Sequence, residues 1–109
     1  MIIVMLVRAL FLGLALCPSA FAQSLTSMQL ATALGSLLAS EQFCGLQYDQ
    51  DAIQKFINSK VSEQDMNFPS TLQMMVMGSE AENRDMSPSS KTAHCTQIAR
   101  VARSYGFIH

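Results

Sequence analysis

The length that remains after the N-terminal segment constrains this chain more than any other feature. The first 22 residues, MIIVMLVRALFLGLALCPSAFA, are almost wholly apolar, carry the single cation Arg8 and end on small residues. That layout is typical of a secretory signal peptide, and it predicts cleavage between Ala22 and Gln23. We therefore expect residues 1–22 to be a signal peptide and residues 23–109 to form one exported domain of 87 residues.

Two other fates of the apolar segment are less favoured. Arg8 interrupts it, and it falls short of the roughly 20 residues that a membrane-spanning helix needs, which argues against an uncleaved anchor. Cys17 is poorly placed for lipidation, because Leu16 precedes it where bacterial lipoprotein signals carry a small residue. We expect a periplasmic or secreted bacterial protein with no stable membrane anchor after cleavage.

Two cysteines survive the expected cleavage, Cys44 and Cys95. Exported proteins enter an oxidising compartment, and two cysteines allow a single pairing, so we expect a Cys44–Cys95 disulfide. Closing a loop of about 50 residues in this way is worth roughly 4 kcal/mol in the chain-entropy estimate. A chain this short has little other means of supporting a small core.

His94 stands directly before Cys95, which raises two alternatives to a structural disulfide. A thiol nucleophile needs a base within hydrogen-bonding distance, whereas neighbours on a helix point about 100° apart. A structural zinc site needs four ligands, and the two cysteines with His94 and His109 have no familiar zinc spacing. We favour the disulfide over a reactive thiol and over a metal site.

Four segments have helical patterns, and none alternates with the period of a strand. The first covers about 27–43, where Thr26 and Gln29 could form a capping box. Gly35 within it either weakens the helix or marks a close helix contact. The second starts after Asp49, a favourable N-cap residue.

The third and fourth helices are indicated by their first residues. Asn67 is a possible cap for the third, with Pro69 in its first turn, and Ser87 with Pro88 opens the fourth. Gly106 sits where a left-handed residue ends a helix. The sequence therefore predicts an all-α domain, a small four-helix bundle with one disulfide.

Charge argues against nucleic acid as a partner. The exported part carries six Lys and Arg against eight Asp and Glu, a formal charge of −2. A phosphate backbone attracts proteins with the opposite balance. All eight acids lie in 41–87, whereas 88–109 has only cations, so we expect a basic helix docked on an acidic body.

Two surfaces are candidates for binding a partner. If the third helix turns Leu72 and Val76 inward, Met74 and Met77 face outward, and exposed methionines adapt to many apolar shapes. The alternative is that one of them belongs to the core. On the fourth helix, Arg100 and Arg103 share a polar face that could contact an anionic partner, unless it is simply solvated.

Nothing in the sequence indicates catalysis or a cofactor. No phosphate-binding glycine loop, Gly-x-Ser-x-Gly turn or metal motif occurs. Acidic pairs such as Glu80 and Glu82 are two residues apart, so on a helix they point to different sides. His94 lies at the edge of an apolar stripe, where it is either a half-buried packing residue or a pH sensor. We expect no catalytic residues, no metal and no cofactor.

Three stretches carry a resemblance to known proteins: EQFCGLQYDQDAIQKFI, STLQMM and KTAHCTQIARVARSYGFI. They resemble a group of small exported alphaproteobacterial proteins without established activity, which often carry the label "signal recognition particle". That particle's protein is a cytosolic GTPase with an RNA-binding domain, whereas this chain has no GTPase motif. A looser likeness, of architecture alone, is to small acid-activated periplasmic chaperones.

These features favour a non-enzymatic binding or chaperone-like protein with protein partners in the cell envelope. One alternative is a small exported redox or thiol enzyme that uses Cys95 with His94. Another is an accessory subunit of an envelope complex.

Overall fold

The computed structural model describes residues 19–109, with side chains from residue 26 onward. This part of the chain is all-helical, as predicted. Its helices are α1 (Ser19–Phe43), α2 (Gln50–Lys60), α3 (Phe68–Arg84) and α4 (Pro88–Ser104). Residues 1–18, most of the expected signal peptide, lie outside the described residues. No helix of the described part has both the length and the hydrophobicity needed to cross a membrane.

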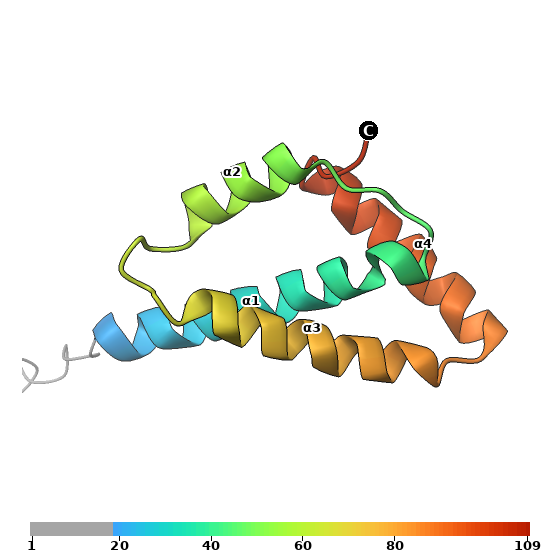
Figure 1. The fold of residues 1–109 in the computed structure, drawn as a ribbon, viewed down its shortest axis with the longest axis horizontal. Helices are drawn as coiled ribbons and strands as arrows, with labels where there is room; N and C mark the ends of the chain where they lie inside the picture. The colour runs from blue at the N-terminus through green and yellow to red at the C-terminus, as the bar shows by residue number, and fades with distance from the viewer. Residues whose placement is uncertain (1–18) are drawn as a thin grey trace, which may run out of the picture.

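The helices α1 and α3 lie side by side and run in the same direction (Figure 1). They can be parallel because α2, which follows α1 and precedes α3 in the sequence, returns the chain to the end of the molecule where α1 begins. The last helix, α4, crosses the C-terminal end of α1 and returns the chain to the start of α2. A backbone hydrogen bond of 2.8 Å from Asp49 N to Phe107 O joins the two ends of that path.

α1 begins earlier than its capping pattern indicated. We expected a start near residue 27, with Thr26 and Gln29 as the capping box, but the helix starts at Ser19 and contains both residues. The segment AFAQSL before Thr26 has no glycine or proline to stop a helix, so the helix continues through the capping pair and does not start there. The expected cleavage point between Ala22 and Gln23 consequently falls inside α1.

The closest approach between helices is at Gly35. A Cβ atom placed there would lie 2.7 Å from Met75 Cβ, which is too short for a real contact, and 3.1 Å from the Met75 carbonyl carbon, which is unusually tight. Only a residue without a side chain lets α1 and α3 approach this closely. Of the two interpretations of Gly35, the structure supports the close helix contact.

Two helix starts use the expected side chains and a third does not. Asp49 accepts hydrogen bonds from the backbone N–H groups of Asp51 and Ala52, and Ser87 accepts one from Ser90 N. Asn67 occupies the N-cap position of α3, but its side chain makes no cap bond. Its backbone is already helical there, at φ −88° and ψ −12°, whereas capping side chains need an extended backbone.

Two helices end in the same motif. Gly106 has φ +77°, and hydrogen bonds run from Gly106 N to Arg103 O and from Phe107 N to Ala102 O. Gly45, at φ +65°, closes α1 with the equivalent pair of bonds. The left-handed glycine turns the chain back, so the residue after it packs against its own helix. This is how Phe107 becomes fully buried.

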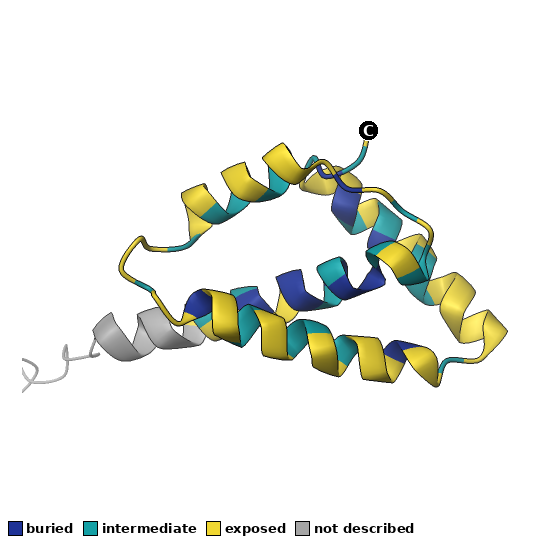
Figure 2. Ribbon diagram, in the orientation of Figure 1, coloured by how far each residue is buried: buried dark blue, intermediate teal, exposed yellow. Residues whose placement is uncertain are grey.

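The core is small and surrounded by half-buried apolar side chains (Figure 2). Its buried hydrophobic cluster consists of Ala31, Leu34, Leu37, Tyr48, Phe68, Ile98, Ala102 and Phe107. On α3, Phe68 is buried, and Leu72 and Val76, which we expected to turn inward, are half-buried together with Met75.

None of the residues of α2 is buried, and its half-buried apolar side chains pack against the core, Phe56 through aromatic contacts. The Phe56 ring lies 4.8 Å from the Tyr105 ring and 5.7 Å from the Phe107 ring, between centroids. Tyr105 is 41% exposed and forms the outer edge of this cluster. Aromatic pairs at such distances are attractive beyond their burial.

We predict that Gly35→Ala destabilises the fold by about 1–2 kcal/mol, because the overlap with Met75 outweighs the better helix propensity of alanine. Gly78→Ala is the matched control, since a Cβ there meets nothing within 4 Å. It should stabilise the protein by up to about 1 kcal/mol. Urea unfolding of both variants measures the difference. Equal effects of the two substitutions would contradict the close contact.

Candidate functional site

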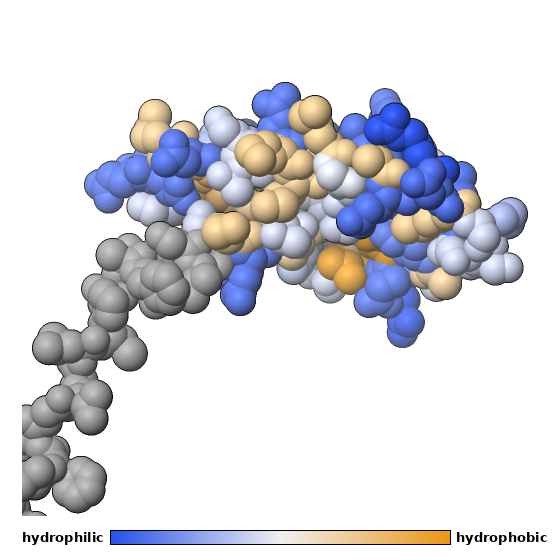
Figure 3. All heavy atoms as spheres, turned by 90° about the horizontal axis from the view of Figure 1, so that it is seen from below, coloured by the Kyte–Doolittle hydropathy of each residue, from blue (hydrophilic) through white to orange (hydrophobic). Residues whose placement is uncertain are grey.

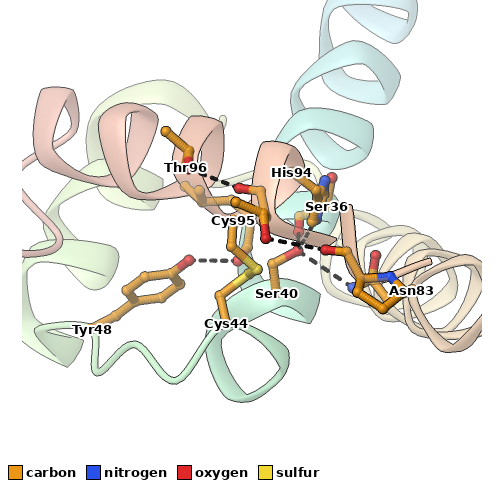
Figure 4. The surroundings of a disulfide bond; sticks show 11 residues. Ser36, Ser40, Cys44, Tyr48, Asn83, His94, Cys95 and Thr96 are labelled. Carbon is orange, nitrogen blue, oxygen red and sulfur yellow. Dashed lines mark hydrogen bonds between the residues drawn. A yellow bond between two sulfur atoms is a disulfide. The ribbon is translucent and has the colours of Figure 1, made fainter. Parts of the chain in front are cut away.

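The expected disulfide is present and joins the residue that follows α1 to the middle of α4 (Figure 4). The Cα atoms of Cys44 and Cys95 are 5.3 Å apart, across a sequence separation of 51. Both sulfur atoms are used in this bond, so the described residues contain no free thiol. A reactive Cys95 would require the disulfide to open first.

A buried hydroxyl next to the disulfide connects three helices. Ser40 of α1 is 0% exposed, and its Oγ donates to Ser36 O at 2.8 Å. Oγ also lies 2.8 Å from His94 Nε2 of α4 and accepts a 3.4 Å hydrogen bond from Asn83 Nδ2 of α3. Because a hydroxyl has one proton, and here Ser36 O receives it, His94 Nε2–H is the donor in this arrangement. The Ser40 hydroxyl is therefore fully paired.

This polar cluster does not have the accessibility of an active site. Ser40 and His94 are spaced like a nucleophile and its base, but a substrate cannot reach a hydroxyl that is fully buried. His94 is half-buried, directs Nε2 at Ser40 and lies 6.2 Å from the Phe43 ring. The geometry corresponds to a packing residue that also links two helices.

Neither Ser40 nor Asn83 was predicted from the sequence as part of a site. A signal for Asn83 was present, because it follows the inward-turned Val76 by seven residues, about two helical turns, and so lies on the same side of α3. Asparagine is uncommon inside a core, and only its partner on another helix makes the position favourable. Within the described part, no buried side-chain nitrogen or oxygen lacks a hydrogen-bond partner.

A shallow depression of about 500 Å³ lies beside the disulfide. It is lined by Gln42, Phe43, Cys44, Gly45, Lys91, Thr92 and Cys95. Lys91 Nζ lies 4.5 Å from the centroid of the Phe43 ring, a cation–π contact at the rim. In the described part of the chain, no three His, Cys, Asp or Glu residues are grouped so as to hold a metal ion.

Tyr48 closes the connection between α1 and α2. Its hydroxyl donates a 2.8 Å hydrogen bond to Leu37 O, and its backbone N–H donates to Glu41 Oε2 at 2.6 Å. Burial, with a smaller contribution from the Glu41 charge, raises the pKa of Tyr48 to about 12. The side chain is thus held as the neutral phenol.

The two candidate methionines face solvent. Met74 is 70% exposed and Met77 is 61% exposed, whereas Met75 between them packs toward α1. They belong to the outward side of α3, which we call the methionine face: Ser70, Met74, Met77, Gly78 and Ala81, all exposed. No charged residue belongs to it over a length of about 17 Å. In the view from below, on the α3 side, apolar side chains gather across the middle of the surface (Figure 3).

Arg100 and Arg103 are both exposed on α4. Figure 1 places α3 along one side of the molecule and the C-terminal half of α4 at the other, so the arginines do not join the methionine face. The predicted docking of the basic fourth helix is observed, and α4 packs against α1. Within the described residues α4 makes no ion pair, and it docks instead through Cys95, Ile98 and Ala102.

Comparison of the chain with protein-family models, with curated proteins and with solved structures finds no match. The interpretation of the site therefore depends on the geometry described above.

We predict that Cys44→Ser, Cys95→Ser and the double substitution each destabilise the fold by the same amount, about 4 kcal/mol. One bond is lost in every case, so the effects do not add. Urea unfolding without reductant measures this, and reduction of the wild type should give the same loss. A clearly larger effect of Cys95→Ser alone would indicate a separate role for that thiol.

We predict that the stabilisation contributed by Tyr48 is lost at alkaline pH. The unfolded phenol ionises near pH 10 and the folded one near pH 12, so unfolding is increasingly favoured between these values. Tyr48→Phe should cost about 1 kcal/mol near neutral pH, through the lost hydrogen bond. The difference in unfolding free energy between the two proteins should shrink above about pH 10. A constant difference would contradict the raised pKa.

Proposed function

We propose that this chain is an exported, non-enzymatic protein that binds apolar segments of other proteins in the cell envelope through the methionine face. The observation that carries the proposal is the exposure of Met74 and Met77 on a side of α3 that carries no charge from Ser70 to Ala81. The inner side of the same helix packs on α1, so these residues are not needed for the core. Unbranched, polarisable methionine side chains fit apolar surfaces of varied shape.

The proposal of export is supported by the apolar N-terminal segment with Arg8 and by the disulfide, which is compatible with an oxidising compartment. The proposal of a non-enzymatic role is supported by two features. The Cys95 sulfur is paired with Cys44, and the only serine near His94 among the described contacts is buried. Both favour binding over the alternative of thiol chemistry with Cys95 and His94.

We predict that Met74→Gln/Met77→Gln weakens binding of an unfolded client by at least about tenfold, since each methionine buries apolar area worth roughly 1 kcal/mol or more. Glutamine has a similar length, is uncharged and suits a helix, so the fold should be retained. The probe is fluorescently labelled, reduced and carboxymethylated α-lactalbumin, measured by anisotropy at high ionic strength to screen charge effects.

The matched control is Met66→Gln, because Met66 is the most exposed methionine of the described part at 81% but lies outside the methionine face, ahead of α3. Its affinity should equal that of the wild type. A second comparison, Arg100→Gln/Arg103→Gln, tests the other candidate surface. Binding that depends on the arginines and not on Met74 and Met77 would overturn the assignment. Capture of one stoichiometric envelope partner, with no affinity for unfolded clients, would favour the accessory-subunit alternative.

A further inference from the structure

We infer that Met74 and Met77 are sites of oxidation to methionine sulfoxide, and that this modification switches off the methionine face while leaving the fold intact. The inference rests on the proposed function, because it concerns the regulation of the same surface. The oxidant class is a peroxide or hypohalous acid.

The reaction needs only the thioether and the oxidant. A lone pair on sulfur attacks one peroxide oxygen, the O–O bond breaks and an S–O bond forms. Sulfur is oxidised by two electrons and hydrogen peroxide is reduced to water. The cysteines of the described part do not compete, because both are already in the disulfide. Exposed methionines are therefore the sulfur groups that are open to oxidation.

Exposure separates the methionines into two classes. Met28, Met66, Met74 and Met77 are exposed, whereas Met75 and Met86 are half-buried. Met75 also packs against the backbone of α1 at Gly35. A Cβ atom added to Gly35 would lie 2.7 Å from Met75 Cβ. An oxidant must approach the sulfur atom closely, so Met75 should react much more slowly than its two neighbours in the sequence.

The position of each sulfur determines the effect of its oxidation. A sulfoxide is polar, and one at Met74 or Met77 faces solvent and disturbs no packing. The two residues are three apart on α3, so their side chains are neighbours and both sulfoxides fall on the same patch. A sulfoxide at Met75 would instead place a polar group at the α1–α3 contact. The arrangement thus permits loss of binding before loss of structure.

The experiment treats the folded, disulfide-bonded protein with increasing hydrogen peroxide. Tandem mass spectrometry gives the oxidation rate of each methionine, circular dichroism reports the fold, and anisotropy with the carboxymethylated α-lactalbumin probe reports binding. Met66, Met74 and Met77 should oxidise at least about tenfold faster than Met75. Binding by the wild type should weaken by about tenfold in step with oxidation of Met74 and Met77, at unchanged helicity.

Two variants assign the effect to residues. Met66→Leu should bind like the wild type and should lose affinity on peroxide treatment to the same extent. Met74→Leu/Met77→Leu keeps apolar side chains that cannot form sulfoxides, so its ratio of affinities before and after peroxide should be one. If this variant loses affinity after peroxide as the wild type does, the inference is overturned although the proposed function stands.

Two further outcomes are decisive. Oxidation of Met75 at the rate of Met74 and Met77, or unfolding in step with their oxidation, would overturn the selective switch. If the untreated wild type does not bind the probe, the proposed function fails, and the switch fails with it; the oxidation rates, measured in the same samples, then still report whether Met74 and Met77 are the accessible sites.

Discussion

The covalent link between the end of α1 and the middle of α4 is the constraint on which the rest of this small structure depends. Few large side chains are fully buried, and α2 contributes none of them. The Cys44–Cys95 bond holds α4 across α1, and the paired hydroxyl of Ser40 adds α3 to the same junction through Asn83. Around this point, the half-buried apolar residues need only moderate packing to complete the domain.

The close contact at Gly35 divides α3 into a side that packs on α1 and a side that faces solvent. Because α1 has no side chain at Gly35, the inner side of α3 packs directly on the α1 backbone there, through Met75 and the backbone next to it. The outer side carries no charge from Ser70 to Gly78 and keeps Met74 and Met77 in solvent. Exposed apolar side chains lower solubility, and these two add nothing to the core. This is why we propose a binding role for the methionine face.

Local signals in the sequence predicted the ends of elements better than the partners of side chains. Asp49 and Ser87 act as caps and Gly106 ends α4, because these signals involve only neighbouring backbone atoms. The start of α1 was predicted wrongly, since a capping pair begins a helix only where the preceding residues do not continue it. Ser40 and Asn83 were missed because each is the other's hydrogen-bond partner and they lie 43 residues apart in the chain.

The sequence alone indicated the helical class through its periodicity, and it indicated the pairing of Cys44 with Cys95 on the expectation that Cys17 is removed. It left open whether Met74 or Met77 belongs to the core, and the structure places both in solvent. Only the tertiary structure decided that α4 docks without ion pairs, and that His94 is hydrogen-bonded to Ser40. It also decided that the arginines and the methionine face lie apart. These depend on how helices cross, and crossing is set by contacts between residues such as Gly35 and Met75 that are distant in the chain.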